Sequence, residues 1–140
     1  MLTALGNSGL PEIVPYVQPY LQSNSESLRM DALNALRRVP GAEIDEVMSR
    51  RIETDPSSLV RTAGLIAVSE RSPSVVVTRA LDTSVRSDKD PQVRATELRT
   101  IVAWLPLEPS FRATLAWLAE NETETSLREA AIAQLAVRTK

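Results

Sequence analysis

Four arginines recur at nearly equal intervals along this 140-residue chain. Arg29, Arg61, Arg94 and Arg128 are separated by 32, 33 and 34 residues. A guanidinium presents five N–H donors in a planar fork, so a row of arginines is suited to binding carboxylates or another anionic ligand. A ligand site would not need one copy in every repeat, and the spacing therefore favours a structural role over a binding ladder.

The remaining residue types give little support for catalysis. The chain contains no cysteine and no histidine, which excludes disulfides, thiol nucleophiles, imidazole bases and zinc sites built on these ligands. The acidic clusters at 45–46 and 120–124 fall on predicted exposed faces or loops, with no apolar pocket to raise a pKa. None of the four glycines builds a phosphate-binding loop. We expect no catalytic, cofactor-binding or metal-binding residue, and hence no enzyme.

Each repeated arginine lies in an amphipathic pattern that predicts a helix. Apolar residues stand at −1, +4 and +7 from it, as Leu28, Leu33 and Leu36 do around Arg29. These offsets follow one stripe of a helix with 3.6 residues per turn. Start signals precede all four helices, namely Ser25, Asp55-Pro56, Asp90-Pro91, and Thr123 or Thr125.

A shorter apolar helix is predicted before each arginine helix, at about 11–22, 43–53, 74–86 and 109–120. Stacked pairs would cover one another's apolar stripes. We therefore predict an all-α domain over 1–140, an α-solenoid of antiparallel helix pairs with about four repeats at 10–39, 43–71, 74–105 and 109–139. Residues 1–9 would end a preceding repeat, so we expect a segment of a longer array unless a short leading segment was trimmed from a single domain.

Three prolines make the first predicted helix the weakest. Pro11, Pro15 and Pro19 recur every four residues, and a proline inside a helix costs about 3 kcal/mol. We expect this segment to be kinked or partly irregular. The alternative is an extended lead-in at 11–14 with the helix beginning at Pro15.

The stretches 9–15 and 28–36 resemble HEAT-type repeats, whose second helix opens with Val/Leu-Arg and whose first helix often has a proline-containing lead. The resemblance spans the whole chain and implies a HEAT-like superhelix without implying an activity. It also implies that the repeated arginine pairs with an acidic residue or a carbonyl group of the adjacent repeat. Plausible acidic partners are Asp31, Asp55, Asp90 and Glu124.

A narrower likeness is to the helical, vitellogenin N-terminal type domain of the large lipid transfer proteins. Residues 2–11 and 32–38 are similar to that domain's ALGN and ALRR stretches. Those proteins also carry β-rich lipid-cavity modules, of which this sequence shows nothing. The likeness implies an origin in such a protein without implying a lipid site in this segment.

Certain positions of the arginine helices are expected to be exposed and to line the concave side of such an array. The candidate partner-binding residues among them are Met30, Asn34, Arg37, Arg38, Ile66 and Arg99. Met30 and Ile66 are apolar where a solvated helix needs no apolar residue, and the arginines add local positive charge. The alternative is an ordinary surface with scattered apolar residues.

Three further residues are open to two interpretations. Glu97 stands where the other repeats place a small residue toward the core. It either lies buried beside Arg61 or Arg94, or, as we favour, extends out to solvent. Trp104 and Trp117 are either partner anchors or, as we favour, packed against a neighbouring repeat.

These observations leave two main functional hypotheses. The leading one is a non-catalytic scaffold for protein–protein interaction, whose partner is another protein or other domains of the same protein. The alternative is the helical domain of a lipid-transport or lipoprotein-assembly protein, with lipid bound only through a larger parent protein. A DNA-binding helical-repeat enzyme would need a basic groove, which a net charge of −2 makes improbable. We therefore expect no nucleic acid as a partner. No run is long and apolar enough for a membrane span, so we expect a soluble chain.

Overall fold

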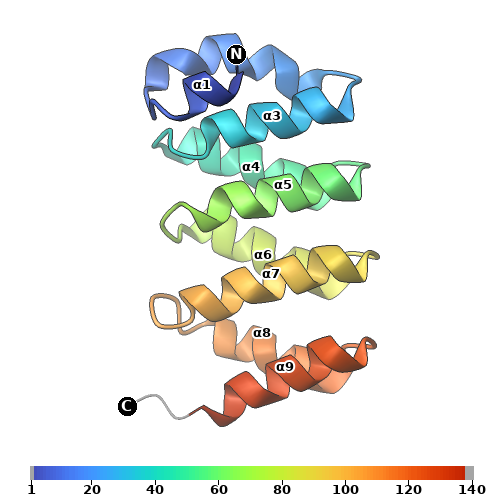
Figure 1. The fold of residues 1–140 in the computed structure, drawn as a ribbon. Coiled ribbons are helices and arrows are strands. Elements are labelled where there is room, and N and C mark those ends of the chain that lie inside the picture. The colour runs from blue at the N-terminus through green and yellow to red at the C-terminus, as the bar shows by residue number, and fades with distance from the viewer. Residues whose placement is uncertain (1, 138–140) are drawn as a thin grey trace. The chain divides into compact units, whose positions relative to one another are not determined.

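The computed structural model describes residues 2–137, which form helices and loops without a β-strand in that range (Figure 1). The all-α prediction is therefore confirmed. The predicted ends at residue 1 and at residues 138–139 lie outside the described residues. The chain divides into two compact units, Met1–Ala80 and Leu81–Lys140, each described separately below.

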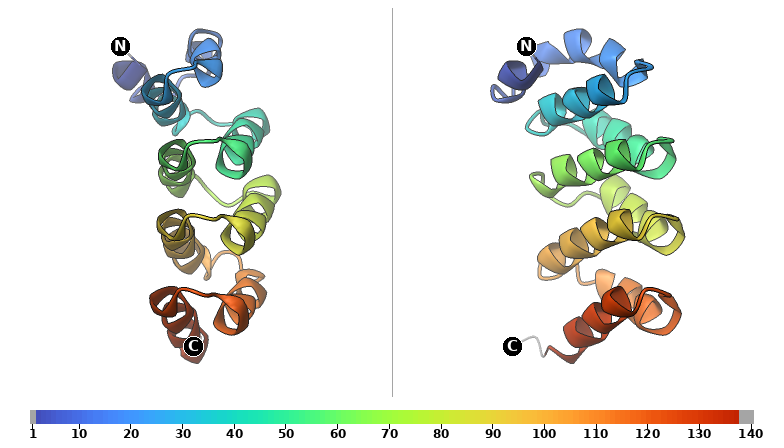
Figure 2. Two further views of the ribbon diagram at one scale, coloured as in Figure 1. Left: turned by 90° about the vertical axis from the view of Figure 1, so that its right-hand side faces the viewer. Right: turned by 45° about the vertical axis from the view of Figure 1, so that its right-hand side comes forward.

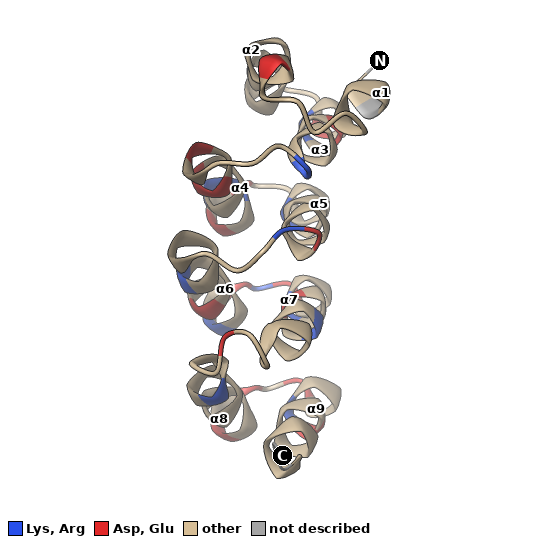
Figure 3. Ribbon diagram, turned by 90° about the vertical axis from the view of Figure 1, so that its left-hand side faces the viewer, with Lys and Arg blue, Asp and Glu red and all other residues tan. Residues whose placement is uncertain are grey.

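The first unit begins with α1 (Leu2–Gly6) and the short helical turns η1 (Pro11–Ile13), α2 (Val14–Val17) and η2 (Gln18–Gln22). It continues with α3 (Glu26–Leu36), α4 (Ala42–Thr54), α5 (Ser58–Ser69) and the start of α6 (Val75–Ser87). Helix α3 packs against α1, η2 and α5, and α4 packs against α5. In Figure 3, α2 and α4 lie on one side of this unit and α3 and α5 on the other.

The second unit contains the end of α6 followed by α7 (Pro91–Trp104), α8 (Phe111–Asn121) and α9 (Thr125–Ala136). Helix α9 packs against both α8 and α7. Figure 2 shows α7 and α9 side by side with α8 in the other layer of this unit. Each unit therefore joins antiparallel neighbouring helices through short loops.

Two of the predicted helix starts are confirmed, and two need correction. The Ser25 hydroxyl caps α3, and Asp90 caps α7 with Pro91 as the first helical residue. The cap of α5 is Ser57 rather than Asp55, whose carboxylate is engaged elsewhere. At α9 the N-cap residue is Glu124, without a side-chain hydrogen bond, so neither predicted threonine caps this helix.

The proline-containing segment is irregular, as predicted. Residues 11–22 form a 3₁₀ turn, a single α-helical turn and a second 3₁₀ turn. Each turn has a proline at its first or second position, where the missing N–H costs no helical hydrogen bond. The alternative with an extended lead-in is wrong, because Pro11–Ile13 is already helical.

The predicted apolar stripes contribute to the cores of both units, except that Leu28 at the start of the first stripe is 36% exposed. Leu33 of α3 is 0% exposed, Leu65 of α5 is 0% exposed and Leu98 of α7 is 5% exposed. The fourth stripe differs, since Ile132 of α9 is 49% exposed. Burying an aliphatic side chain contributes about 1.5–3 kcal/mol, so the first three stripes account for much of the packing energy.

One glycine permits an unusually close helix contact in the first unit. A Cβ atom on Gly6 would lie 2.7 Å from the Cα atom of Ala35, closer than real Cβ contacts allow. The end of α1 therefore rests directly on the backbone of α3. No helix within residues 2–137 is long and apolar enough to cross a membrane.

Candidate functional site

Two of the repeated arginines bind a carboxylate through both oxygens, an arrangement that we call a carboxylate clamp. Arg29 shows it within the first unit. Its Nε donates to Oδ2 of Asp55 at 3.0 Å and its Nη2 donates to Oδ1 at 3.1 Å. Its Nη1 donates to the Ser23 carbonyl at 2.9 Å. The guanidinium therefore ties the start of α3 to the loop that follows α4.

Asp55 is held by several donors at once. It is 2% exposed, and it also accepts from Arg51 Nη1 at 3.3 Å and from the Ser57 amide at 3.0 Å. Burial raises the pKa of Asp55, but the hydrogen bond and charge of Arg29, with the Ser57 amide and Arg51, outweigh burial and lower the pKa below its ordinary value. The carboxylate stays ionised at neutral pH.

Arg94 repeats the same clamp within the second unit. Its Nε and Nη2 donate to the two carboxylate oxygens of Glu122, each at 2.9 Å, and its Nη1 donates to the Asp88 carbonyl at 2.8 Å. Glu122 is 6% exposed and accepts from the Glu124 amide at 2.8 Å. Burial raises the pKa of Glu122, while the hydrogen bonds and charge of Arg94 and the backbone amides lower it overall.

All four repeated arginines share one hydrogen bond to the backbone. Each donates from Nη1 to the carbonyl oxygen six residues earlier, on Ser23, Asp55, Asp88 and Glu122 respectively. Among the acids proposed as partners, Asp55 binds Arg29, whereas Asp31 is exposed on α3 and Asp90 caps α7. Glu124 lies exposed beside Glu122, which is the acid that Arg94 binds.

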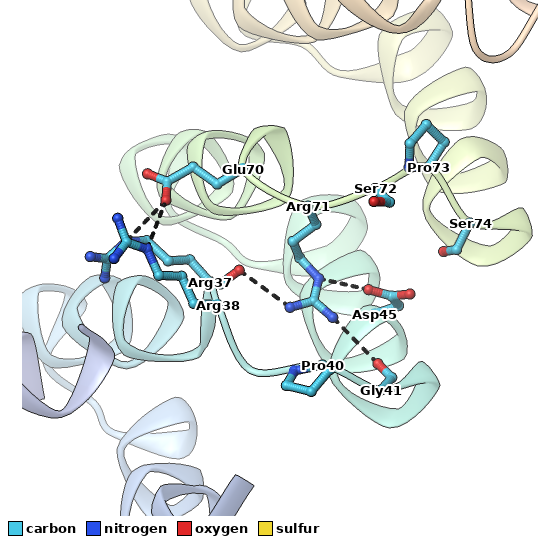
Figure 4. A pocket seen from close by; sticks show the side chains of 10 residues that line it. All are labelled: Arg37, Arg38, Pro40, Gly41, Asp45, Glu70, Arg71, Ser72, Pro73 and Ser74. Carbon is cyan, nitrogen blue, oxygen red and sulfur yellow. Dashed lines mark hydrogen bonds and ion pairs between the residues drawn. The ribbon is translucent and has the colours of Figure 1, made fainter. Parts of the chain in front are cut away.

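Three arginines line an open hollow of about 460 Å³ at the end of α3 in the first unit (Figure 4). Arg37 and Arg38 reach the Glu70 carboxylate at 3.3 and 3.6 Å. Arg37 also donates to the Asn34 carbonyl and to the Asn7 side chain, each at 2.7 Å. The expectation that Arg37 is exposed is wrong, because these partners hold it at 9% exposure beneath the surface.

Arg71 is the third arginine of the hollow, and the sequence reasoning missed it. Its Nε donates to Asp45 at 2.8 Å, and its Nη1 donates to the carbonyls of Leu36, Arg37 and Val39, where α3 ends. The Leu36 carbonyl also accepts from the Val39 amide at 3.0 Å, and a cation at this end of α3 matches the helix dipole. An arginine stands ten positions after the repeated arginine in two of the four repeats, as Arg71 and Arg138, whereas Val39 and Trp104 occupy this position in the other two, so the repeat signal for Arg71 is weak.

The other predicted partner-binding residues occupy different environments. Met30 and Asn34 are partly buried on α3, Arg38 is exposed, and Ile66 on the neighbouring α5 is 56% exposed. Arg99 belongs to the second unit, where it is exposed and donates to the Thr96 hydroxyl at 3.2 Å. A role in partner binding stays a prediction for all six residues. Figure 3 shows acidic and basic positions interspersed within each unit.

Three residues with two interpretations are placed inside the second unit. Glu97 is 0% exposed, so the favoured interpretation of an exposed side chain is wrong, and its pairing with Arg61 or Arg94 stays a prediction. Trp104 is buried at 5% exposure, and Trp117 is partly buried with the Arg86 guanidinium 5.1 Å from its ring centroid. Packing therefore accounts for Trp104, whereas both interpretations of Trp117 stay predictions.

The chemistry of these groups favours binding and support over catalysis. Asp55 and Glu122 have both carboxylate oxygens occupied by donors and lowered pKa values, which suits neither a general acid nor a free base. The residues that the structure describes contain no group of histidine, cysteine or acidic side chains arranged to hold a metal ion. Arg29 and Arg94 thus connect neighbouring helices, and Arg71 caps the end of α3.

The sequence was compared with known protein families, curated proteins and solved structures. A family model described as the vitellogenin TPR domain matches residues 1–101. This range begins in α1 and extends into α7. The chain has no match among curated proteins or solved structures.

Proposed function

The chain belongs to the vitellogenin TPR domain family, and on that premise we propose that it is the helical domain of a lipid-transport or lipoprotein-assembly protein. The observation that carries the proposal is the family match over residues 1–101. It coincides with the likeness of residues 2–11 and 32–38 to the helical domain of the large lipid transfer proteins. The comparison thus supports the second of the two functional hypotheses better than the general scaffold.

In this proposal the domain supports a lipid-binding module and holds no lipid itself. The apolar side chains that could contact an acyl chain are largely used between helices, as Leu33, Met48 and Ile52 at 0% exposure illustrate. The hollows in the first unit are open and lined partly by charged residues such as Arg37, Arg71 and Asp45. An enclosed apolar cavity would suit a lipid better.

The helix pairs of this domain stack as a HEAT-like α-solenoid of about four repeats in the proposal. Support comes from the arginine clamps, since Arg29 and Arg94 each reach an acid in the loop of the following helix pair. Stacked units of this kind need contacts mainly between neighbours, and the clamps of Arg29 and Arg94 provide such contacts. The repeat borders are those given by the sequence pattern.

A non-catalytic role is part of the same proposal. The buried acids Asp55 and Glu122 are paired with arginines, and a carboxylate held in such a pair is poorly suited to transfer a proton. A rigid helical surface that positions other modules needs neither a cofactor nor a nucleophile.

The proposal is tested by measuring the lipid bound to the protein when it is purified from cells. The protein is purified through an epitope tag, and bound lipid is extracted and quantified by mass spectrometry, with a mock purification as background. The 140-residue chain alone is treated in the same way. We expect lipid above background with the cellular protein and none with the isolated chain. A lipid-free cellular protein would contradict a lipid-transport role, and lipid on the isolated chain would contradict a supporting role.

A protein-interaction scaffold remains the second candidate, because Ile66 is 56% exposed on α5. An exposed isoleucine on a helix that also contributes to the core suits a partner's apolar side chain. An Ile66→Ser variant should lose a co-purifying partner while keeping its helical circular-dichroism spectrum. An Ala63→Ser variant on the same helix is the control, and equal recovery of the partner with both variants would exclude Ile66 from the contact.

A further inference from the structure

Helix α9 exposes Ile132, at a position of the apolar stripe that its counterparts bury. Ile132 is 49% exposed, whereas Leu33 and Leu98, at the same offset from their arginines, are 0% and 5% exposed. In each unit a neighbouring arginine helix packs on the counterpart, α5 on α3 and α9 on α7. Leu135, three residues further along the same stripe, is partly buried.

Arg128 sits at the start of this face with its fork only partly used. Its Nη1 donates to the Glu122 carbonyl at 2.9 Å, as in the other repeats. Its Nη2 reaches only the Thr125 hydroxyl at 3.5 Å. Among residues 2–137, no carboxylate takes the two hydrogen bonds that Asp55 accepts from Arg29 and Glu122 accepts from Arg94.

The clamps of Arg29 and Arg94 define what would complete the clamp of Arg128. Asp55 directly follows α4, which ends at Thr54, and Glu122 directly follows α8, which ends at Asn121. In both cases the carboxylate also accepts the amide two residues later, from Ser57 or Glu124, which holds the acid in place. The complementary group is therefore an acid fixed at the end of the first helix of a helical hairpin.

We propose that the face formed by Arg128, Ile132 and Leu135 docks a helical hairpin whose first helix is followed directly by an aspartate or glutamate. The acid binds Nε and Nη2 of Arg128, and an aliphatic stripe of the hairpin's second helix covers Ile132. Charge complementarity fixes the register of the hairpin, while apolar burial supplies most of the binding energy. The inference does not depend on lipid and stands if the proposed function fails.

A second copy of this chain does not match the site. The residue that directly follows η2, in the first helix pair, is Ser23, where the other pairs carry an acid. A copy docked head to tail in register would therefore place a hydroxyl against Arg128. In addition, α1 already packs on α3 at that end of the first unit. The hairpin must come from a sequence with an acid at this position.

The proposal is tested in the full chain with one further helical hairpin fused to its C-terminus. A copy of residues 109–137 is joined to Lys140, which reproduces the six-residue connection 105–110 between α7 and α8. The added copy carries its Glu122 or a Glu122→Gln change, and each form is made with Arg128 and with Arg128→Gln. Hydrogen exchange of the α9 amides reports how well the face is covered.

We expect the extension to slow exchange across α9, and the glutamate copy to slow it about tenfold more than the glutamine copy. The Arg128→Gln change should remove that difference, whereas an Arg99→Gln control should leave it intact. Equal protection by the two copies, or no protection by either, would overturn the proposal. Concentration-dependent protection of the unextended chain would also overturn it, because a second copy would then be the occupant.

Discussion

Arg29 and Asp55 are 26 residues apart in sequence and meet through two parallel hydrogen bonds, Nε to Oδ2 at 3.0 Å and Nη2 to Oδ1 at 3.1 Å. Arg94 and Glu122 repeat this arrangement 28 residues apart. The two N–H groups of the guanidinium fork bind both oxygens of the carboxylate. Each pair therefore fixes the relative orientation of the two side chains as well as the distance between them. The recurring Val/Leu-Arg motif thereby gains a physical explanation in both units.

Removing the charge of Asp55 should destabilise the first unit. An Asp55→Asn variant keeps the size of the side chain but places an NH₂ group against the Arg29 fork or the Ser57 amide. We expect a loss of about 2 kcal/mol in the free energy of unfolding, typical for hydrogen bonds to charged groups. Urea denaturation followed by circular dichroism measures this loss.

The matched control is Asp31→Asn, since Asp31 is exposed on α3. Exposed charges usually contribute little, and its midpoint should stay close to that of the unchanged protein. If both variants unfold at the same urea concentration as the parent, the Asp55 clamp does not stabilise the fold.

Acid should weaken the protein through the same two carboxylates. The ordinary pKa values are 3.8 for Asp55 and 4.5 for Glu122, and both pKa values are lowered in the folded state. A lowered pKa means that the unfolded chain binds protons first. The stabilisation is therefore complete above the ordinary pKa and is lost as the pH falls through the lower, folded value.

Unfolding midpoints measured from about pH 6 down to about pH 2.5 test this expectation. The Asp55→Asn and Glu122→Gln variants should show a shallower decline below about pH 4.5 than the parent, because each lacks one titrating clamp. The double variant should be shallower still. Parallel declines for parent and variants would mean that other carboxylates carry the acid sensitivity.

The sequence predicted the helices and their buried stripes well, because both follow from local spacing. Leu33, Leu65 and Leu98 lie on stripes that any helix of 3.6 residues per turn would form, and all three are buried. The irregular first segment was predictable for the same reason, since three prolines at a four-residue spacing cannot all lie inside one regular helix. The burial of α9 was overestimated, because the pattern does not show which helix face has a neighbour.

Contacts that depend on the path of a loop were not predictable. Arg71 caps the end of α3 from more than 30 residues away, and Arg37 turns inward toward Asn7 and Glu70 instead of facing solvent. An arginine stands eight positions after the repeated arginine only at Arg37, and ten positions after it only at Arg71 and Arg138, so the periodicity indicates these contacts weakly. Glu97 illustrates a different limit, since hydropathy alone favours an exposed carboxylate and the structure buries this one completely.

Replacing Arg71 should loosen the end of α3. An Arg71→Met variant keeps the aliphatic stem but removes the Arg71 donors to the Leu36 and Val39 carbonyls and to the Asp45 carboxylate, and the Leu36 carbonyl then keeps only the Val39 amide. We expect the free energy of unfolding to fall by at least about 1 kcal/mol. Hydrogen exchange should also quicken where Arg71 binds, at residues 36–41. Arg38→Met is the control, because the Arg38 side chain is 54% exposed. Equal exchange in the two variants would show that the cap contributes nothing.

The close approach of α1 to α3 gives the most direct test of packing in the first unit. A Gly6→Ala change would normally favour a helix by about 1 kcal/mol, because alanine is the better helix former. Here the added Cβ would lie 2.7 Å from the Ala35 Cα and 2.8 Å from Arg37 Nη1. The backbone atom cannot move away without shifting α3, so α1 should be displaced. We expect lower stability and faster hydrogen exchange in α1.

Gly64→Ala is the matched control for this test. Its added Cβ would meet the Ile52 Cγ1 atom at 3.0 Å, a side-chain atom that a small rotation can move. The penalty should therefore be smaller than at Gly6, since the backbones of α4 and α5 need not separate. If Gly6→Ala proved as stable as the parent, α1 would not rest on the α3 backbone in solution. The order of the two variants in thermal unfolding therefore separates backbone contact from side-chain contact.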